Sequence, residues 1–394
     1  MRTDPLSFLN TELDSLKQQG LFRKLRVLEG EAAAHATFDH KSVVNLSSNN
    51  YLGLTTHPKL KQAALDAVSK YGVGSGSVRT ISGTLEMHME LERRLAAFKH
   101  VEAVVVFQSG FAANAGTVAA VLTKEDVVIS DELNHASIID GCRLSRAGIK
   151  VFPHKDVDAA RKILKELPAT QRKLLITDGV FSMEGDLGPL PELCSLAEEY
   201  GAIMMVDDAH ASGVFGSNGS GTVDHFRCHG RVDIQVGTLS KAVGVLGGYV
   251  AGSRTLIDFL YHRARPFLFS TSHPPAVTAA CLAALDVLET EPQWIEKLWD
   301  NTRFFKAGLE RLGFNTGLSE SPITPVIVGE AATAAKMSDT LFEHGVFAQS
   351  IGFPTVARDK ARLRTIVAAT HTREDLQYAL DMFGKVGREL GVIQ

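Results

Sequence analysis

The residue that first suggests chemistry is a lysine surrounded by small side chains. Lys241 stands in Gly237-Thr-Leu-Ser-Lys241-Ala-Val-Gly, shortly after an apolar run that predicts a strand. A lysine held among small groups can be desolvated, and its amine then becomes a neutral nucleophile toward carbonyl carbons. The hydroxyls of Thr238 and Ser240 are suitable donors to a phosphate. The same stretch would also suit a surface lysine in a glycine-rich turn, so both interpretations stay open here.

Two adjacent acids end a second apolar run. In Val206-Asp207-Asp208-Ala-His210 the two carboxylates point to opposite sides of an extended chain. One of them could therefore face a ligand while the other makes a structural bond. An acid opposite a pyridine nitrogen keeps that nitrogen protonated, so that a pyridine cofactor can accept electrons. The competing interpretation is a pair of helix-capping aspartates.

Two more predicted strand-to-helix junctions carry polar or small residues. Asn134-His135-Ala-Ser137 follows the apolar run at Val127, and Gln108-Ser109-Gly110-Phe111 follows the run at Val104. The flat ring of His135 could stack on an aromatic cofactor, although a lone histidine after a strand is more often structural. Small residues that open a helix leave backbone N–H groups free for an anion, but such junctions commonly contain glycine.

The elements that must position these residues follow from the apolar pattern. Strands without polar alternation, separated by helix-length segments, predict a mostly parallel α/β sheet covered on both faces. Its ligand site would lie beyond the carboxyl ends of the strands, where the residues above are found. The runs are residues 104–107, 127–130, 173–177, 203–206 and 234–236. We expect a helix from Ser7 to Gly20 and a polar connector within residues 1–45, a large domain over 46–285 and a smaller α+β domain over 286–394.

The composition of the 394 residues excludes several classes of protein. With 45% hydrophobic and 22% charged residues and a formal net charge of −4, the chain has no nucleic-acid or membrane-surface footprint. No apolar run approaches the roughly 20 residues that span a bilayer. The early acid and proline of Met1-Arg-Thr-Asp-Pro-Leu argue against a secretory signal. Four widely spaced cysteines indicate reduced thiols, so we expect a cytoplasmic protein.

A metal site is not expected. His35 with His40, and His225 with Cys228 and His229, are close in sequence, but no convergent set of three or four ligands accompanies them.

Together the motifs resemble the α-oxoamine synthase family of fold-type-I pyridoxal-phosphate enzymes. The resemblance runs from about residue 7 to the end of the chain and keeps the family's order. It rests on Asn49-Asn50-Tyr51-Leu-Gly53, Ser109-Gly110-Phe111, Asn134-His135-Ala-Ser137-Ile-Ile-Asp140, Thr177-Asp-Gly-Val-Phe-Ser182, Val206-Asp207-Asp-Ala-His210, Thr238-Leu-Ser-Lys241 and Arg265-Pro-Phe-Leu-Phe-Ser270-Thr271. It implies an acyltransferase whose large domain binds pyridoxal 5'-phosphate.

The resemblance also implies a role for each matching residue. Lys241 would form an imine with the cofactor, Asp207 would pair with the ring nitrogen, and His135 would stack on the ring. Further cofactor contacts are expected from His210 and Ser182 beside the ring hydroxyl, from Gly110, Phe111 and Thr238 at the phosphate, and from Ser270 and Thr271 at the phosphate in a neighbouring subunit. Substrate contacts are expected from Arg364, Asn50 and Arg23; a guanidinium suits a carboxylate. Shared sites imply a homodimer.

The substrates are expected from one stretch. Gly76-Ser-Val-Arg79-Thr-Ile-Ser-Gly-Thr84 resembles the glycine C-acetyltransferase branch (2-amino-3-ketobutyrate coenzyme A ligase) of the family. We therefore expect interconversion of glycine plus acetyl-CoA with 2-amino-3-oxobutyrate plus CoA, in threonine degradation. The alternatives are an 8-amino-7-oxononanoate synthase, which takes alanine and a pimeloyl thioester in biotin synthesis, an enzyme with both activities, and a non-catalytic relative that binds the cofactor.

Overall fold

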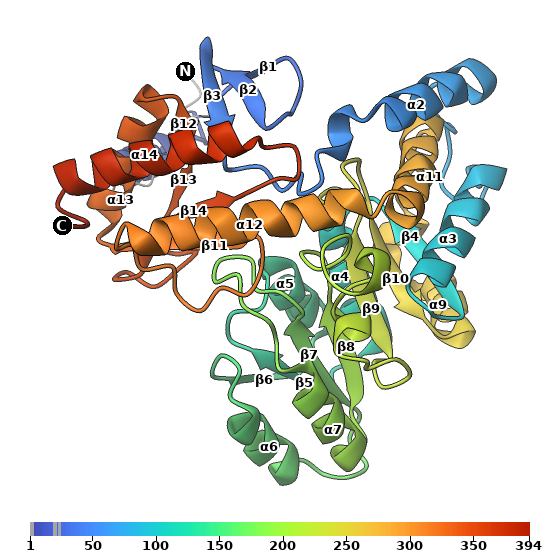
Figure 1. The fold of residues 1–394 in the computed structure, drawn as a ribbon. Coiled ribbons are helices and arrows are strands. Elements are labelled where there is room, and N and C mark those ends of the chain that lie inside the picture. The colour runs from blue at the N-terminus through green and yellow to red at the C-terminus, as the bar shows by residue number, and fades with distance from the viewer. Residues whose placement is uncertain (1–3, 19–21, 23–24) are drawn as a thin grey trace.

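A seven-stranded sheet lies at the centre of the computed structural model, which describes residues 4–18, 22 and 25–394 (Figure 1). All of its strands run parallel except β10, which is antiparallel to both neighbours. In spatial order they are β4 (Ala103–Phe107), β10 (Gly248–Gly252), β9 (Ile234–Thr238), β8 (Ile203–Asp207), β7 (Lys173–Asp178), β5 (Val127–Asp131) and β6 (Gly148–Phe152). The predicted fold class is confirmed. The sequence analysis did not identify β6, a largely exposed edge strand, or β10, which begins and ends with glycine.

Helices cover both faces of this sheet, because its strands are apolar on both sides. Val105 and Phe107 of β4 belong to a core cluster with α4, α5, α9 and α10, whereas Val104 and Val106 pack in the cluster of α2, α3 and α11. Helices α6 and α7 pack against β5, β7 and β8 and form a third core cluster with them. The bounds are α2 (Pro58–Tyr71), α3 (Glu86–Phe98), α4 (Gly110–Val121), α5 (Ala136–Ser145), α6 (Val157–Glu166), α7 (Leu190–Tyr200), α8 (Thr222–His225), α9 (Arg254–Arg263), α10 (Arg265–Leu268) and α11 (Pro275–Thr290), with short 3₁₀ turns η1 (Leu54–Thr56) and η2 (Ser217–Gly219).

The C-terminal region forms a second, smaller α/β unit (Figure 1). Its antiparallel sheet has the order β11-β14-β13 and packs with three helices. The bounds are α12 (Gln293–Arg311), β11 (Ile323–Gly329), α13 (Ala331–Glu343), β12 (Val346–Phe347), β13 (Gln349–Ile351), β14 (Ala361–Ile366) and α14 (Arg373–Glu389). The boundary at residue 285 stays a prediction.

The N-terminal region differs from the expected polar connector. After α1 (Phe8–Gln18) the chain forms β1 (Leu28–Glu29), β2 (His35–Phe38) and β3 (Lys41–Asn45), and β3 pairs in parallel with β12. This pairing joins residues about 300 positions apart, so no local pattern predicts it. Helix α1 buries none of its residues, and Gly20, where the helix was expected to end, lies outside the described residues.

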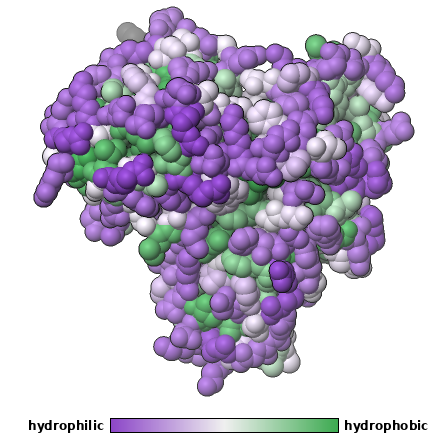
Figure 2. All heavy atoms as spheres, viewed as in Figure 1, coloured by the Kyte–Doolittle hydropathy of each residue, from purple (hydrophilic) through white to green (hydrophobic). Residues whose placement is uncertain are grey.

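The surface and the thiols agree with an ordinary globular chain. Hydrophilic residues predominate on the face shown in Figure 2, and apolar residues are broken into separate patches. None of the described helices combines the length and apolarity needed to cross a membrane. All four cysteines are buried and free. Within the described part of the chain, no three His, Cys, Asp or Glu side chains converge as metal ligands.

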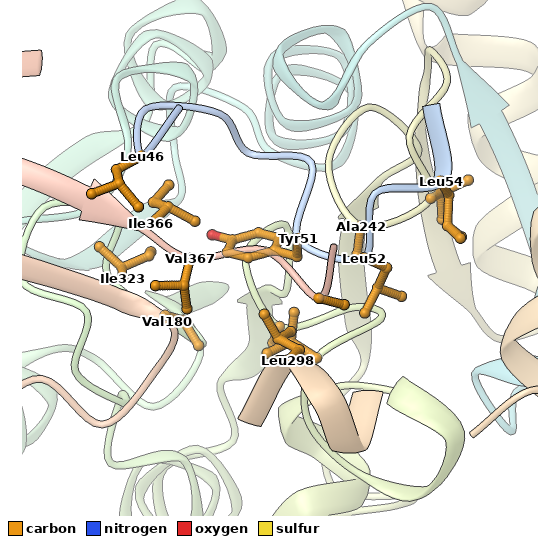
Figure 3. Close-up of a cluster of buried hydrophobic side chains, with 14 of the residues drawn as sticks. Leu46, Tyr51, Leu52, Leu54, Val180, Ala242, Leu298, Ile323, Ile366 and Val367 are labelled. Carbon is orange, nitrogen blue, oxygen red and sulfur yellow. The ribbon is translucent and has the colours of Figure 1, made fainter. Parts of the chain in front are cut away.

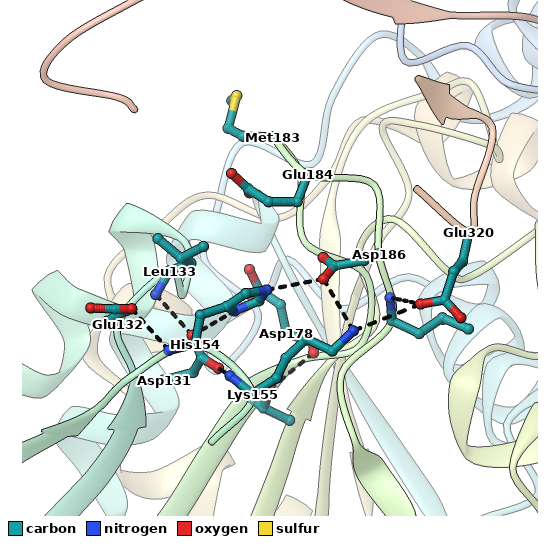
Figure 4. Close-up of polar contacts among 12 residues, drawn as sticks. Asp131, Glu132, Leu133, His154, Lys155, Asp178, Met183, Glu184, Asp186 and Glu320 are labelled. Carbon is teal, nitrogen blue, oxygen red and sulfur yellow. Dashed lines mark hydrogen bonds and ion pairs between the residues drawn. The ribbon is translucent and has the colours of Figure 1, made fainter. Parts of the chain in front are cut away.

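A polar cluster ties the loop after β7 to both parts of the molecule (Figure 4). The ring of His154 lies between two carboxylates, with Nδ1 3.1 Å from Asp131 Oδ1 and Nε2 3.0 Å from Asp186 Oδ2. Lys155 Nζ lies 3.1 Å from the same Asp186 oxygen and 3.7 Å from Oε2 of Glu320, which precedes β11. The cluster therefore connects the large sheet to the C-terminal unit through charged side chains.

We expect the contribution of His154 to stability to depend on pH. Burial by itself would lower the pKa of His154, but hydrogen bonds to Asp131 and Asp186 outweigh burial and raise it to about 9. An unfolded histidine titrates near pH 6.5, so the stabilisation is complete below about pH 6.5 and is lost as pH rises through 9. His154→Gln should therefore lower the free energy of unfolding by at most about 3 kcal/mol at pH 6 and by much less at pH 10.

Urea unfolding of both proteins from pH 6 to 10 measures this difference. His262→Gln is the matched control, because that exposed histidine bonds a backbone carbonyl, the Asp258 O. A His154→Gln difference that stays constant across the pH range would contradict the charged assignment.

Candidate active site

A cavity of about 200 Å³ lies at the carboxyl ends of the central strands. Its wall includes the last residues of three neighbouring strands, Asp178 of β7, Asp207 of β8 and Thr238 of β9. Parallel strands end at one edge of a sheet, which is why side chains distant in sequence converge there. The predicted residues gathered in the wall are Gly110, Phe111, His135, Ser182, Asp207, His210, Thr238 and Lys241. The wall also includes Ser109, Asn114, Ser137, Asp178, Val180, Ala209 and Ser240.

Lys241 has the properties of a nucleophile in this cavity. Burial lowers the pKa of Lys241 to about 8, although the charge of Asp207 opposes the shift; Arg364 adds to it. A substantial fraction of the amine is therefore neutral near physiological pH. Its Nζ lies 2.9 Å from Nε2 of His210, so the amine is held in one direction.

Asp207 and His135 are positioned by one hydrogen-bond network. Asn114 on α4 donates to Asp207 Oδ2 at 2.6 Å and to Ser137 Oγ at 2.9 Å. The Ser137 hydroxyl in turn lies 2.7 Å from Nδ1 of His135, whose pKa burial lowers. The neutral ring and the acid are thus set in a fixed relation by the intervening amide and hydroxyl. A flat ring beside a buried acid suits an aromatic nitrogen cofactor.

The second acid of the pair has a structural role. Asp208 is fully buried, and its Oδ2 accepts from Lys99 Nζ at 2.9 Å. Thr222 donates to the same carboxylate through its backbone N–H at 3.1 Å. Gly221 has a φ of 111°, and a Cβ there would lie 2.0 Å from Asp208 Oδ2, so this turn requires glycine. The two adjacent acids therefore divide the work between the cavity and the core.

The N-terminus of α4 could hold a phosphate. The Ser109 side chain caps the helix by accepting from the backbone N–H of Ala112 at 3.1 Å, while the first amides, those of Gly110 and Phe111, border the cavity. Free helix-terminal amides favour an anion. The loop approaches β10 so closely that a Cβ on Gly248 would lie 2.4 Å from the Gly110 nitrogen. The hydroxyls, amides, amine and acid that share this wall together fit pyridoxal phosphate.

Arg364 lies close to the cavity but is held by other groups. Its Nε donates to the carbonyl oxygen of Ser182 at 2.5 Å, and both terminal nitrogens lie 3.3 Å from Asn49 Oδ1. Burial lowers the pKa of this guanidinium. The structure does not bring Asn50 to the cavity, because its amide nitrogen donates to Ala32 O at 3.1 Å and to Thr55 Oγ1 at 2.7 Å. Asn49, its neighbour, is the asparagine that faces Arg364.

Three other predicted positions lie elsewhere. Arg23 lies outside the described residues, so its predicted substrate contact has no structural account. Ser270 lines a separate small cavity, and Thr271 forms a β-bridge with Val78. Within one chain neither of the two residues borders the main cavity. Their predicted contact with a phosphate would therefore require a second copy of the chain and stays a prediction.

Three residues that matter here were given no role in the sequence analysis. Asp178 ends β7 in register with Asp207, and the rule of strand ends could have identified it. Burial, reinforced by the charge of Asp207, raises the pKa of Asp178 well above its ordinary value. Asn114 borders the cavity from within α4, and Tyr51 reaches the site through His210. No sequence signal distinguishes these two residues from ordinary core positions.

Comparison with known proteins agrees with this fold. Residues 41–383 match the model of the family described as "Aminotransferase class I and II". A protein of Symbiobacterium thermophilum described as 8-amino-7-oxononanoate synthase is 60% identical over 98% of this chain and 99% of its own length. The structure of a serine palmitoyltransferase variant from S. paucimobilis with bound PLP–myriocin aldimine has a TM-score of 0.94, 34% identity and coverage of 99% and 100%. The structure of 8-amino-7-oxononanoate synthase from Francisella tularensis has a TM-score of 0.75 and 28% identity, and the match covers 88% of this chain and 98% of that one.

Fold, cavity and relatives define a fold-type-I, pyridoxal-phosphate-dependent transferase. The chain belongs to the aminotransferase class I and II family and, within it, to the α-oxoamine synthases. It is therefore an acyltransferase-type enzyme whose cofactor is pyridoxal 5'-phosphate.

The expected substrates were wrong. Four relatives that are 55–60% identical over nearly their full lengths are described as 8-amino-7-oxononanoate synthases, which contradicts glycine C-acetyltransferase, the pair glycine and acetyl-CoA, and a role in threonine degradation. The stretch used to choose the branch explains the error. Arg79 is buried in an ion pair with Glu92 at 2.9 and 3.0 Å and also bonds Thr84. The arginine of the Ser-Val-Arg pattern is thus held by internal contacts, so its presence by itself does not identify the substrate.

Proposed function

We propose that this enzyme is an 8-amino-7-oxononanoate synthase, which condenses alanine with a pimeloyl thioester. The observation that carries the proposal is the 60% identity to a synthase of that description over almost the whole of both chains. Carbon balance then sets the reaction: a seven-carbon acyl group and a three-carbon amino acid yield a nine-carbon product only if one carbon leaves as carbon dioxide. The thioester releases its thiol in the same overall reaction.

We assign the residues the roles that the family resemblance implies, and their place in the wall of one cavity supports this assignment. When bound, pyridoxal phosphate supplies an electron-accepting ring that stabilises negative charge on the α-carbon of the amino acid. Lys241 provides the amine that holds the cofactor and takes the α-proton of the substrate. Asp207 keeps the ring nitrogen protonated, and His135 packs on the ring.

The remaining contacts hold the cofactor and the amino acid in place. When the cofactor is bound, His210 and Ser182 would contact its ring hydroxyl, and Gly110, Phe111 and Thr238 would bind its phosphate. Arg364 binds the substrate carboxylate in place of its contact with Asn49. Four buried and unpaired thiols favour a reducing compartment, so the cytoplasm stays the predicted location.

Steady-state rates with two substrate pairs test the proposal. The enzyme loaded with its cofactor should give a kcat/KM with alanine and pimeloyl thioester at least about 100-fold above that with glycine and acetyl-CoA, because pocket contacts worth about 3 kcal/mol distinguish the pairs. Product mass and carbon dioxide release identify the reaction. Equal rates, or faster turnover of the glycine pair, would refute the assignment.

Replacing Arg364 should weaken substrate binding. We expect Arg364→Ala to raise the KM for alanine by roughly 100-fold, since a charge-assisted, two-point contact with the carboxylate is lost. Arg362→Ala is the matched control, because that arginine is on the same strand but bonds Met183 O and Glu184 Oε1 at 3.0 Å each. Initial rates over a range of alanine concentrations measure both. A KM that rises as much in the Arg362→Ala protein would remove the special role of Arg364.

A further inference from the structure

A buried tyrosine lies behind the histidine that contacts the active-site lysine. Tyr51 Oη lies 2.7 Å from Nδ1 of His210, and the other ring nitrogen of His210 lies 2.9 Å from Lys241 Nζ. The three polar groups form an unbroken line from the core to the cavity. Tyr51 is 1% exposed, and His210 is 8% exposed.

Tyr51 itself does not border the cavity. Its ring packs in an apolar cluster where the two parts of the molecule meet, and Figure 3 shows its hydroxyl as the one oxygen drawn among these side chains. The other members of the cluster that are labelled in Figure 3 are Leu46, Leu52, Leu54, Val180, Ala242, Leu298, Ile323, Ile366 and Val367. Packing alone would be satisfied by phenylalanine, so the hydroxyl needs a separate explanation.

The chemistry of a neutral imidazole explains why a hydroxyl is present at Tyr51. Burial, together with the charge of Lys241, lowers the pKa of His210 well below its ordinary value, so the ring carries one N–H. When Nζ is an ammonium, it donates to Nε2, and the ring proton on Nδ1 must then be accepted by the tyrosine oxygen. When Nζ is a neutral amine, Nε2–H donates to it, and Nδ1 must accept from the tyrosine O–H. A hydroxyl serves in both arrangements.

We propose that Tyr51 is a positioning residue for Lys241. The tyrosine hydroxyl holds the ring of His210 and can pair with either tautomer of that ring. His210 can then change its tautomer when Nζ gains or loses a proton, and neither of its buried ring nitrogens is left unpaired. Among the described residues, Tyr51 is the group that the structure bonds to Nδ1 of His210.

Other charged groups face this line and act on it through space. Asp207 and Asp178 favour the ammonium form of Lys241, whereas Arg364 disfavours it, and both Arg364 and His135 disfavour a charged His210. These groups remain in place when only the hydroxyl of Tyr51 is removed. A change seen on that removal is therefore attributable to the hydrogen bond.

Tyr51→Phe in the full-length protein tests the proposal. The cofactor is removed and pyridoxal phosphate is added back over a range of pH, with its capture by the protein followed by visible absorbance. Because the neutral amine attacks the aldehyde, the midpoint of the rate reports the pKa of Lys241, which is about 8. Removing the hydroxyl leaves Nδ1 unpaired in both arrangements, but the loss is larger for the ammonium, whose charge-assisted bond to Nε2 depends on the ring proton at Nδ1 having an acceptor. The midpoint should therefore fall by about one pH unit, a tenfold change in acidity.

Tyr249→Phe is the matched control. Tyr249 is also 1% exposed, and its hydroxyl lies 2.8 Å from Ser212 Oγ, so the substitution removes an equally buried hydrogen bond away from His210. Its midpoint should equal that of the unaltered protein. A Tyr51→Phe midpoint that is also unaltered would overturn the proposal.

A double-mutant cycle tests whether the hydroxyl acts through His210. His210→Gln should lower the midpoint, and adding Tyr51→Phe should lower it no further. A further fall of about one unit in the double variant would show a path that avoids His210 and would overturn the proposal.

A second measurement serves if Tyr51→Phe does not fold. Replacing all six tyrosines by 3-fluorotyrosine makes each hydroxyl a poorer acceptor with little change in shape. The midpoint should fall in the otherwise unaltered chain and not in His210→Gln; no fall in the former would overturn the proposal. The inference rests on the proposed assignment of Lys241. Failure of that assignment would appear differently, as undiminished capture in Lys241→Ala.

Discussion

Replacing Lys241 by alanine is expected to abolish both turnover and covalent capture of pyridoxal phosphate. The loss of kcat should be at least about 10⁴-fold, because the side chain supplies both the amine that holds the cofactor and the base for the α-proton. No other amine borders the cavity as described, so none of the lining residues replaces it. Initial rates and the visible absorbance of the dialysed protein measure the two losses.

A second lysine controls for the loss of a buried amine as such. Burial also lowers the pKa of Lys306, but its Nζ bonds the carbonyl oxygens of Ser319 and Ser321 at 2.7 and 3.2 Å, and none of these three residues borders the cavity. Lys306→Met should therefore reduce stability and keep the absorbance of the bound cofactor. Normal turnover in Lys241→Ala would end the assignment of the site.

Asp207→Asn should retain the cofactor and lose most of the proton-abstraction rate. A neutral amide of the same shape can still accept from Asn114, but its lack of charge no longer keeps a ring nitrogen protonated. We expect exchange of the α-proton of alanine with solvent to slow by at least about 10²-fold. Proton exchange followed by NMR measures this step without the acyl donor.

The neighbouring strand offers a matched substitution. Asp178 lies beside Asp207 in the sheet register, and burial raises the pKa of Asp178 well above its ordinary value. Asp178→Asn makes the same substitution at the end of the next strand, at an acid to which we assign no contact with the ring nitrogen, and should slow exchange far less than Asp207→Asn. Comparable losses in the two variants would mean that the charge of Asp207 is not the property that matters.

The polar cluster around His154 has a consequence for how the site is held together. The loop after β7 carries Ser182, whose carbonyl oxygen accepts from Arg364, and it also carries Asp186, which bonds His154 and Lys155. Contacts from the large sheet and from the C-terminal unit thus meet on one short loop. The loop thereby fixes Arg364, which we propose to bind the substrate carboxylate, through the carbonyl oxygen of Ser182.

Much of this protein follows from local sequence alone. Apolar runs without polar alternation predict buried parallel strands, and the polar residues that follow them, among them Asp207 and Lys241, then collect at one edge. The order of the motifs indicates the family and its cofactor. These inferences succeed because each depends on a few consecutive residues whose spacing is set by the strand or turn that carries them.

Tertiary structure decided what depends on contacts between distant segments. It assigned Arg79 to an ion pair with Glu92, a partner that the short stretch around Arg79 does not reveal. It turned Asn49 rather than Asn50 toward Arg364, and it placed Tyr51 behind His210, 159 positions along the chain. Short motifs cannot express such pairings, because the side chain's partner, rather than its own neighbours in sequence, determines what it does.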